Sequence, residues 1–156
     1  MEKKSHTARN ITIVVIIVLL VLILGFIAYN SYQRSSPPTF TETLSGTITV
    51  DPLAYRYLTI TVPSGASDPI LSIYFIAQGG ARNDIRCFVI DETNFINWQN
   101  GHPAFILYDS GQVSTAKGQI SLPGPGTYYI VFDNTFSVFS SKTVNYSITL
   151  KYTYQR

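Results

Sequence analysis

Few residues of this 156-residue chain carry side chains from which catalytic or metal sites are built. Cys87 is the only cysteine, and only one of the two histidines, His102, lies outside the first ten residues. A hydroxyl or thiol nucleophile needs a neighbouring base, and a structural zinc ion needs about four ligands. The sequence contains no Gly-x-Ser-x-Gly elbow and no phosphate-binding glycine loop. It therefore predicts a protein that is not an enzyme and that holds no cofactor.

Asp91 and Glu92 form the only pair of adjacent carboxylates, directly after an apolar run. Paired acids serve glycoside hydrolysis or bind calcium, but the spacing of the nearby acids and amides matches no calcium loop. Adjacent positions of a strand point to opposite faces, so the two groups would have to lie in a loop to act together. We expect a solvated strand end here and no metal site.

Aromatic and amide side chains are interleaved between residues 94 and 105. The candidates for contact with a partner in this segment are Phe95, Trp98, Asn100, His102 and Phe105. Rings offer stacking area and amides offer directional hydrogen bonds, which suits a sugar or a peptide ligand. The same residues also suit a covered core with Trp98 as its plug and His102 in an exposed turn, and the sequence leaves both interpretations open.

A second candidate region begins where an apolar strand ends at Asp133 and Asn134. Their side chains can accept hydrogen bonds from backbone amides two residues further on, which closes an Asx turn. Phe136 and Phe139 follow in the same connection. We expect Phe136 or Phe139 to pack beneath the loop as its anchor; in the alternative interpretation, the loop contacts a ligand.

Residues 126–137, continued by Phe139, Lys142 and the alternating strand 144–150, resemble the last hairpin of GOLD (Golgi dynamics) domains. The shared pattern is a Gly-x-Tyr turn, a strand ending in Phe-Asp-Asn, a connection rich in serine and threonine with an aromatic residue, a lysine and a final alternating strand. GOLD domains occur in emp24-type transmembrane cargo receptors and in some lipid-transfer proteins. The resemblance implies a β-sandwich interaction module facing away from the cytoplasm. Its candidate contacts are Asp133, Asn134, Phe136, Phe139 and Lys142.

A β-domain has to hold these residues, and the sequence after residue 41 has the composition of one. Residues 144–154 alternate apolar and polar side chains, which places one face in a core and the other in water. The other predicted strands are residues 47–50, 55–62, 70–77, 84–90, 105–108, 118–122 and 127–132, separated by turn sequences such as Asn100-Gly101 and Ser110-Gly111. We expect no substantial helix in this part. About seven or eight short strands predict an all-β fold, an antiparallel β-sandwich over residues 42–156.

Residues 11–29 are predicted to form one N-terminal transmembrane helix. Fifteen of the eighteen residues from 11 to 28 are Ile, Val, Leu or Phe, and none is charged. A helix of this length spans about 27 Å, close to the ~30 Å hydrocarbon core of a bilayer. Lys3, Lys4 and Arg9 precede it, so the positive-inside rule places residues 1–10 in the cytoplasm and the domain outside. Residues 30–41 contain two consecutive prolines and are expected to form a spacer.

The remaining composition constrains the partners. From residue 39 onward, seven Lys or Arg accompany eight Asp or Glu, so no basic stripe for nucleic acid is present. One cysteine excludes an intramolecular disulfide, and the apolar residues 88–90 beside it predict a buried thiol. Asn145-Tyr146-Ser147 is an acceptor triplet for N-glycosylation on the outward row of its strand. The expected partners are membrane lipid, through the helix, and another extracytoplasmic protein.

These observations favour a single-pass membrane protein whose domain, at the cell surface or in a lumen, is a protein-interaction module. A pilin-like subunit of a surface filament is an alternative, because such subunits also place an apolar helix before a β-domain; it requires removal of residues 1–10. A carbohydrate-binding surface module built on Trp98 is a second alternative. The oligomeric state stays open.

Overall fold

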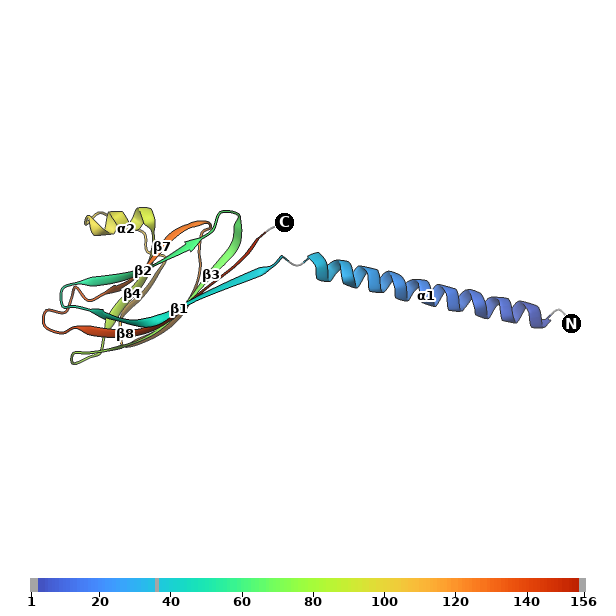
Figure 1. Ribbon diagram of the computed structural model, residues 1–156, viewed down its shortest axis with the longest axis horizontal. Coiled ribbons are helices and arrows are strands. Elements are labelled where there is room, and N and C mark those ends of the chain that lie inside the picture. Colours follow the sequence, from blue (N-terminus) through green and yellow to red (C-terminus); the bar gives the residue numbers. More distant parts are fainter. Residues whose placement is uncertain (1–2, 36, 155–156) are drawn as a thin grey trace. The chain divides into compact units, whose positions relative to one another are not determined.

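The computed structural model describes residues 3–35 and 37–154, with side chains described for residues 12–32 and 37–154. The chain divides into two compact units, Met1–Pro37 and Pro38–Arg156. The first unit holds helix α1 (Lys3–Ser35), and the second holds eight strands and a short helix (Figure 1).

Helix α1 is long and apolar enough over Thr12–Tyr32 to cross a membrane. These 21 residues extend about 31 Å, the thickness of the hydrocarbon core. None of their side chains is buried, so this part of α1 is not packed as the core helix of a folded domain. The predicted spacer is wrong at both ends, because α1 continues to Ser35 and the first strand begins at Thr39. The consecutive prolines 37 and 38 separate the two elements, since proline disfavours helical backbone in the residue before it.

The second unit is an antiparallel sandwich of two four-stranded sheets. One sheet has the strand order β1-β8-β3-β6 and is termed the β8 sheet; the other has the order β2-β7-β4-β5 and is termed the β7 sheet. The strands are β1 (Thr39–Val50), β2 (Tyr55–Val62), β3 (Ala66–Gln78), β4 (Ile85–Asp91), β5 (Tyr108–Val113), β6 (Thr115–Ser121), β7 (Gly126–Asp133) and β8 (Lys142–Tyr154). The predicted fold class is confirmed.

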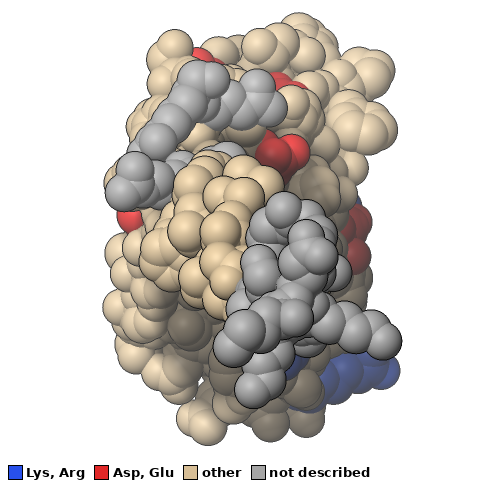
Figure 2. Space-filling view, turned by 90° about the vertical axis from the view of Figure 1, so that its right-hand side faces the viewer, with Lys and Arg blue, Asp and Glu red and all other residues tan. Residues whose placement is uncertain are grey.

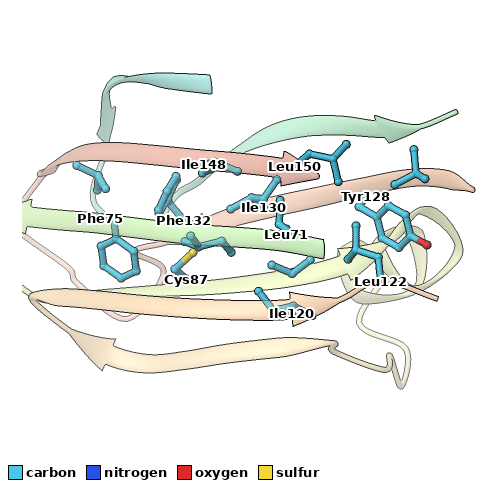
Figure 3. Packing of buried hydrophobic residues seen from close by; sticks show 14 of the residues in the cluster. Leu71, Phe75, Cys87, Ile120, Leu122, Tyr128, Ile130, Phe132, Ile148 and Leu150 are labelled. Atoms are coloured by element: carbon cyan, nitrogen blue, oxygen red, sulfur yellow. The ribbon is translucent and has the colours of Figure 1, made fainter. Parts of the chain in front are cut away.

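The core lies between the two sheets and is built from alternate residues of each strand (Figure 3). Phe75 of β3 and Phe132 of β7 meet edge to face across it, with ring centroids 5.7 Å apart. Cys87 of β4 is fully buried, and burial raises the pKa of its thiol. The predicted buried thiol and the predicted core-facing row of β8, which includes Ile148 and Leu150, are confirmed.

A helix, α2 (Glu92–Gln99), forms where a loop was predicted, and it packs on the outer face of the β7 sheet (Figure 1). Asp91 is its N-cap, because Asp91 Oδ1 accepts a hydrogen bond of 2.8 Å from the backbone N–H of Asn94. Glu92 lies in the first turn, where the helix dipole favours negative charge. Asp91 thus ends β4, as predicted, and also starts a helix that was not predicted.

The strand predicted at residues 105–108 is also wrong, because β5 begins only at Tyr108. The side-chain oxygen of Asn94 accepts a hydrogen bond from the backbone N–H of Phe105, which holds the returning chain at the start of α2. The turn predicted at Ser110-Gly111 lies inside β5, where Gly111 has a φ of 63° and the β4 pairing shifts its register. Asn100-Gly101 ends α2 and does not connect two strands.

Candidate functional site

Three loops meet at one end of the sandwich, termed here the far end. They are residues 51–54 (the β1–β2 loop), 79–84 (the β3–β4 loop) and 134–141 (the β7–β8 loop). The chain enters the domain at Pro38, and the twelve residues of β1 run from there to the far end (Figure 1). At about 3.3 Å per residue, β1 separates the far end from the point of entry by roughly 40 Å.

Asn134 is fully buried beneath these loops and links two of them. Its side-chain nitrogen donates to three backbone oxygens, those of Ser140 at 2.9 Å, Asp51 at 3.0 Å and Val50 at 3.3 Å. Its backbone N–H donates to the backbone oxygen of Ala54 at 2.9 Å. One residue thus ties the β1–β2 loop to the β7–β8 loop.

Lys142 is the second buried polar anchor, with 3% of its side chain exposed. Its Nζ donates to Asp84 Oδ1 at 2.8 Å and to the backbone oxygen of Gly79 at 3.0 Å. The hydrogen bond from Lys142 lowers the pKa of the Asp84 carboxyl below its ordinary value, so this acid is ionised at neutral pH. The pair fixes the β3–β4 loop to the start of β8.

The β7–β8 loop satisfies much of its own backbone. The predicted Asx turn is present, since Asp133 Oδ1 accepts a hydrogen bond from the backbone N–H of Thr135 at 2.9 Å. The backbone N–H of Ser137 donates to the oxygen of Asn134 at 3.1 Å, and its hydroxyl donates to the oxygen of Ser140 at 3.0 Å. These polar contacts hold the loop in its conformation.

Of the two rings considered as anchors of this loop, Phe139 does not pack beneath it. Phe139 is 92% exposed, its neighbour Val138 is 57% exposed, and Phe136 is half-buried. Leu53 in the β1–β2 loop is 62% exposed, and its backbone N–H donates to the oxygen of Ser137 at 2.9 Å. Leu53, Val138 and Phe139, on two hydrogen-bonded loops, are termed the apolar tip.

Leu53 was missed from the sequence, although an apolar residue inside the turn sequence Asp-Pro-Leu-Ala was a usable signal. Its φ of 55° lies in the left-handed region, which costs a residue with a branched side chain roughly 1 kcal/mol or more. The hydrogen bond from its backbone N–H to the oxygen of Ser137 holds Leu53 in this conformation.

The aromatic rings of α2 are mostly covered. Phe95 is 4% exposed and stacks on Tyr129 with ring centroids 4.0 Å apart. Trp98 meets Tyr55 and Phe88 edge to face at 4.8 Å and 5.0 Å. Trp98 is therefore part of a second hydrophobic cluster between α2 and the β7 sheet.

The remaining α2 candidates serve the end of the helix or lie on the surface. The side-chain nitrogen of Asn100 donates to the backbone oxygen of Ile96 at 2.8 Å, within the last turn. His102 is exposed, and its backbone N–H donates to the oxygen of Asn97 at 2.9 Å. Phe105 is 67% exposed. The structure thus places the α2 candidates on the outer face of the β7 sheet and the hairpin candidates in and under the far-end loops.

Charged groups on the described part of the domain are few, and half of them lie in ion pairs with one another. Arg86 binds both carboxylate oxygens of Asp109, with Nη2 and Oδ2 2.7 Å apart, and the guanidinium lies over the Phe88 ring. This contact lowers the pKa of Asp109. In the view of Figure 2, charged side chains form small separate groups among neutral ones. Within the described part of the chain, no group of three or more His, Cys, Asp or Glu is placed to hold a metal ion.

No protein-family model matches this chain, and no curated protein matches its sequence. Among solved structures, the subunit of Bacillus endospore appendages, described as disulfide-linked pili, is 11% identical with a TM-score of 0.48, covering 76% of this chain and 91% of that one. A cleaved adhesin domain of Lys-gingipain from Porphyromonas gingivalis is 16% identical with a TM-score of 0.40, covering 60% of each chain. The CBM36-1 domain of a xylanase from the hindgut metagenome of Trinervitermes trinervoides is 12% identical with a TM-score of 0.34, covering 72% of this chain and 96% of that one. At these identities the likeness concerns the β-sandwich fold alone.

Proposed function

We propose that this chain is a membrane-anchored protein-interaction module, in which α1 holds the β-sandwich on the extracytoplasmic side of a membrane and the apolar tip binds another protein. The observation that carries the proposal is the apolar tip itself, three large apolar side chains on rigid loops at the far end of the domain. The same proposal includes that the protein is not an enzyme.

The exposure of the tip supports a protein partner. Burying a phenylalanine or leucine side chain stabilises a contact by about 1.5 to 3 kcal/mol, and aromatic residues are enriched at the centres of protein interfaces. Phe139 is 92% exposed, so nearly all of this stabilisation is obtained only when a partner covers the ring. Because Asn134 and Lys142 already order the loops, binding costs little conformational entropy there.

The position of the tip fits a domain that reaches away from an anchor. The anchoring helix precedes Pro38, and β1 leads directly from Pro38 to the far end. The basic residues before the apolar segment favour a cytoplasmic N-terminus. The resemblance to GOLD domains supports the same assignment, because Phe139 lies in the connection on which that resemblance rests.

Photo-crosslinking with the full membrane-anchored chain in its host tests the proposal. Phe139→Asp should reduce the amount of the main crosslinked protein at least tenfold, because a carboxylate in an apolar contact loses its hydration. Phe105→Asp is the matched control, since Phe105 is also a largely exposed phenylalanine, and it should leave the capture unchanged. Circular dichroism should show both variants folded.

A loss of capture with Phe105→Asp alone would assign binding to the α2 surface. Unchanged capture in both variants would refute the apolar tip as the binding site. Protease added outside sealed cells should digest a C-terminal tag, and protection of that tag would refute the orientation. Intact mass spectrometry that shows removal of residues 1–10 would favour the pilin-like alternative.

A further inference from the structure

The side of the sandwich formed by β1 and β2 is open. β1 is an edge strand of the β8 sheet, and β2 is an edge strand of the β7 sheet. β1 is twelve residues long, and its pairing with β8 is unbroken from Thr39 to Val50. Among residues 3–35 and 37–154, no strand neighbours its other side, which therefore presents a row of backbone N–H and C=O groups unpaired by any strand of this part of the chain.

Proteins usually protect such an edge with proline, lysine or a bulge. β1 contains no proline, lysine or arginine, has no register shift, and carries Glu42 as its single charge. The other two edge strands carry such protection, because β6 contains Lys117 and the register of β5 is interrupted near Gly111. Since β2 carries Arg56, β1 is the edge strand that has neither a basic residue nor a register shift.

The core is incompletely covered along this edge. A groove of about 520 Å³ lies between β1 and β2, and its apolar lining includes Leu44, Ile60 and Leu150. Leu44 is 40% exposed and Phe40 is 42% exposed. Both lie on the face of β1 that, further along the strand, packs Val50 into the core. These apolar side chains thus lie on the core-facing side of β1 but remain partly exposed, because no strand covers them at this edge.

We propose that the free edge of β1 accepts an extended strand of a partner protein. Pairing with β1 satisfies the backbone groups of both strands, and the period of two in the incoming strand places every second side chain over Leu44 and Ile60. The incoming strand therefore alternates aliphatic and polar residues. This strand-binding edge is separate from the apolar tip and goes beyond the proposed function.

The charge of the groove specifies the partner further. Glu42 is the one charged residue among those that line the groove, and its carboxylate accepts a hydrogen bond of 3.1 Å from the neutral hydroxyl of Tyr152. No basic residue of β1 compensates this negative charge. Glu42 lies on the same face of β1 as Leu44, so a lysine or arginine opposite Glu42 occupies one position in the otherwise aliphatic, core-facing row of the incoming strand and complements this charge.

The test uses the full chain in detergent micelles and three fluorescent nine-residue peptides. The first alternates valine and threonine around a central lysine, the second has glutamate in place of lysine, and the third repeats the first with an N-methylated backbone. Fluorescence anisotropy should show binding of the first peptide, at least tenfold weaker binding of the second and none of the third, which cannot donate backbone hydrogen bonds. Equal binding of all three peptides, or binding of none, overturns the proposal.

Two variants place the site. Leu44→Lys puts a charge on the core-facing side of the edge and should weaken binding of the lysine peptide at least tenfold. Ser45→Lys is the matched control on the opposite face of β1 and should change binding less than twofold. Glu42→Lys should reverse the preference between the lysine and glutamate peptides. If Leu44→Lys and Ser45→Lys act alike, the groove is not the site.

Two further measurements separate this proposal from the others. Phe139→Asp should leave peptide binding unchanged, so failure at the apolar tip and failure at the β1 edge are distinguishable. Sedimentation should show the full chain as a monomer in micelles. A dimer that Leu44→Lys dissociates would mean that a second copy of the chain occupies the edge, and this result would overturn a partner strand.

Discussion

The α2 segment and the β7–β8 loop carry the same kinds of side chains and use them in opposite ways. Each follows a buried strand and starts with an aspartate that accepts a backbone hydrogen bond, Asp91 in one case and Asp133 in the other. In the first, the bond caps a helix that turns Phe95 onto the sheet. In the second, it closes a turn whose loop leaves Phe139 in water. In both regions the aspartate sets the conformation of the backbone that follows it. That conformation then decides whether a nearby aromatic ring packs in the core or lies on the surface.

Removing a ring from the covered region should have the largest effect. Phe95→Ala should lower the free energy of unfolding by about 3 to 5 kcal/mol, because it leaves a cavity between α2 and the β7 sheet. Urea denaturation followed by the fluorescence of Trp98, the only tryptophan, measures this loss. A loss below about 1 kcal/mol would mean that α2 contributes little to the core and would break the comparison.

Removing the buried amide beneath the exposed region should have the next largest effect. Asn134→Ala should cost about 2 to 4 kcal/mol, because three backbone oxygens lose their donor at once. Hydrogen exchange should also become faster in residues 51–54 and 134–141. Gln119→Ala, which removes an exposed amide, should stay within about 0.5 kcal/mol of the native chain and serves as the control. Equal losses in the two variants would contradict the role of Asn134.

Lowering the pH should weaken the far end by a smaller amount. The pKa of Asp84 is lowered in the folded chain, so its contribution to stability is present above its unfolded value of 3.8 and is lost as the pH falls through the folded pKa. Unfolding curves between pH 7 and pH 2.5 should show this decline, and Asp84→Asn should reduce it. Asp109 has a lowered pKa for the same kind of reason, so part of the decline should persist in the variant. A pH dependence that Asp84→Asn leaves unchanged would contradict the Lys142 pair.

Removing the exposed ring should have the smallest effect on stability. Phe139→Ala should change the free energy of unfolding by less than about 0.5 kcal/mol, because the ring is 92% exposed. The same urea experiment measures it alongside Phe95→Ala. A large loss would show that Phe139 packs within the fold in solution, and the distinction between the two regions would disappear.

The elements with a local signal were readable from the sequence. The alternation of residues 144–154 predicts β8, and the uncharged apolar run predicts the long helix, since each pattern depends only on near neighbours. Helix α2 was missed because its eight residues are too short for a helical stripe. Its start signal was present, however, as Asp91 three positions before Asn94.

The exposure of Phe139 was not readable, and the reason is physical. The conformation of its loop depends on hydrogen bonds between Asn134 and residues 50 and 51, more than eighty positions earlier in the chain. The open edge of β1 depends likewise on the strand order, which places β8 and not β2 beside it. No local pattern records contacts at such separations, so both surfaces emerge only from the folded chain.

The unbroken pairing of β1 with β8 also has a mechanical meaning. A pull between Pro38 and the far-end loops acts along β1, and the inter-strand hydrogen bonds of an antiparallel pair lie across that direction. Such a load shears the whole ladder at once and does not peel it bond by bond. The strand that follows α1 in the sequence is thus oriented to carry tension through the domain.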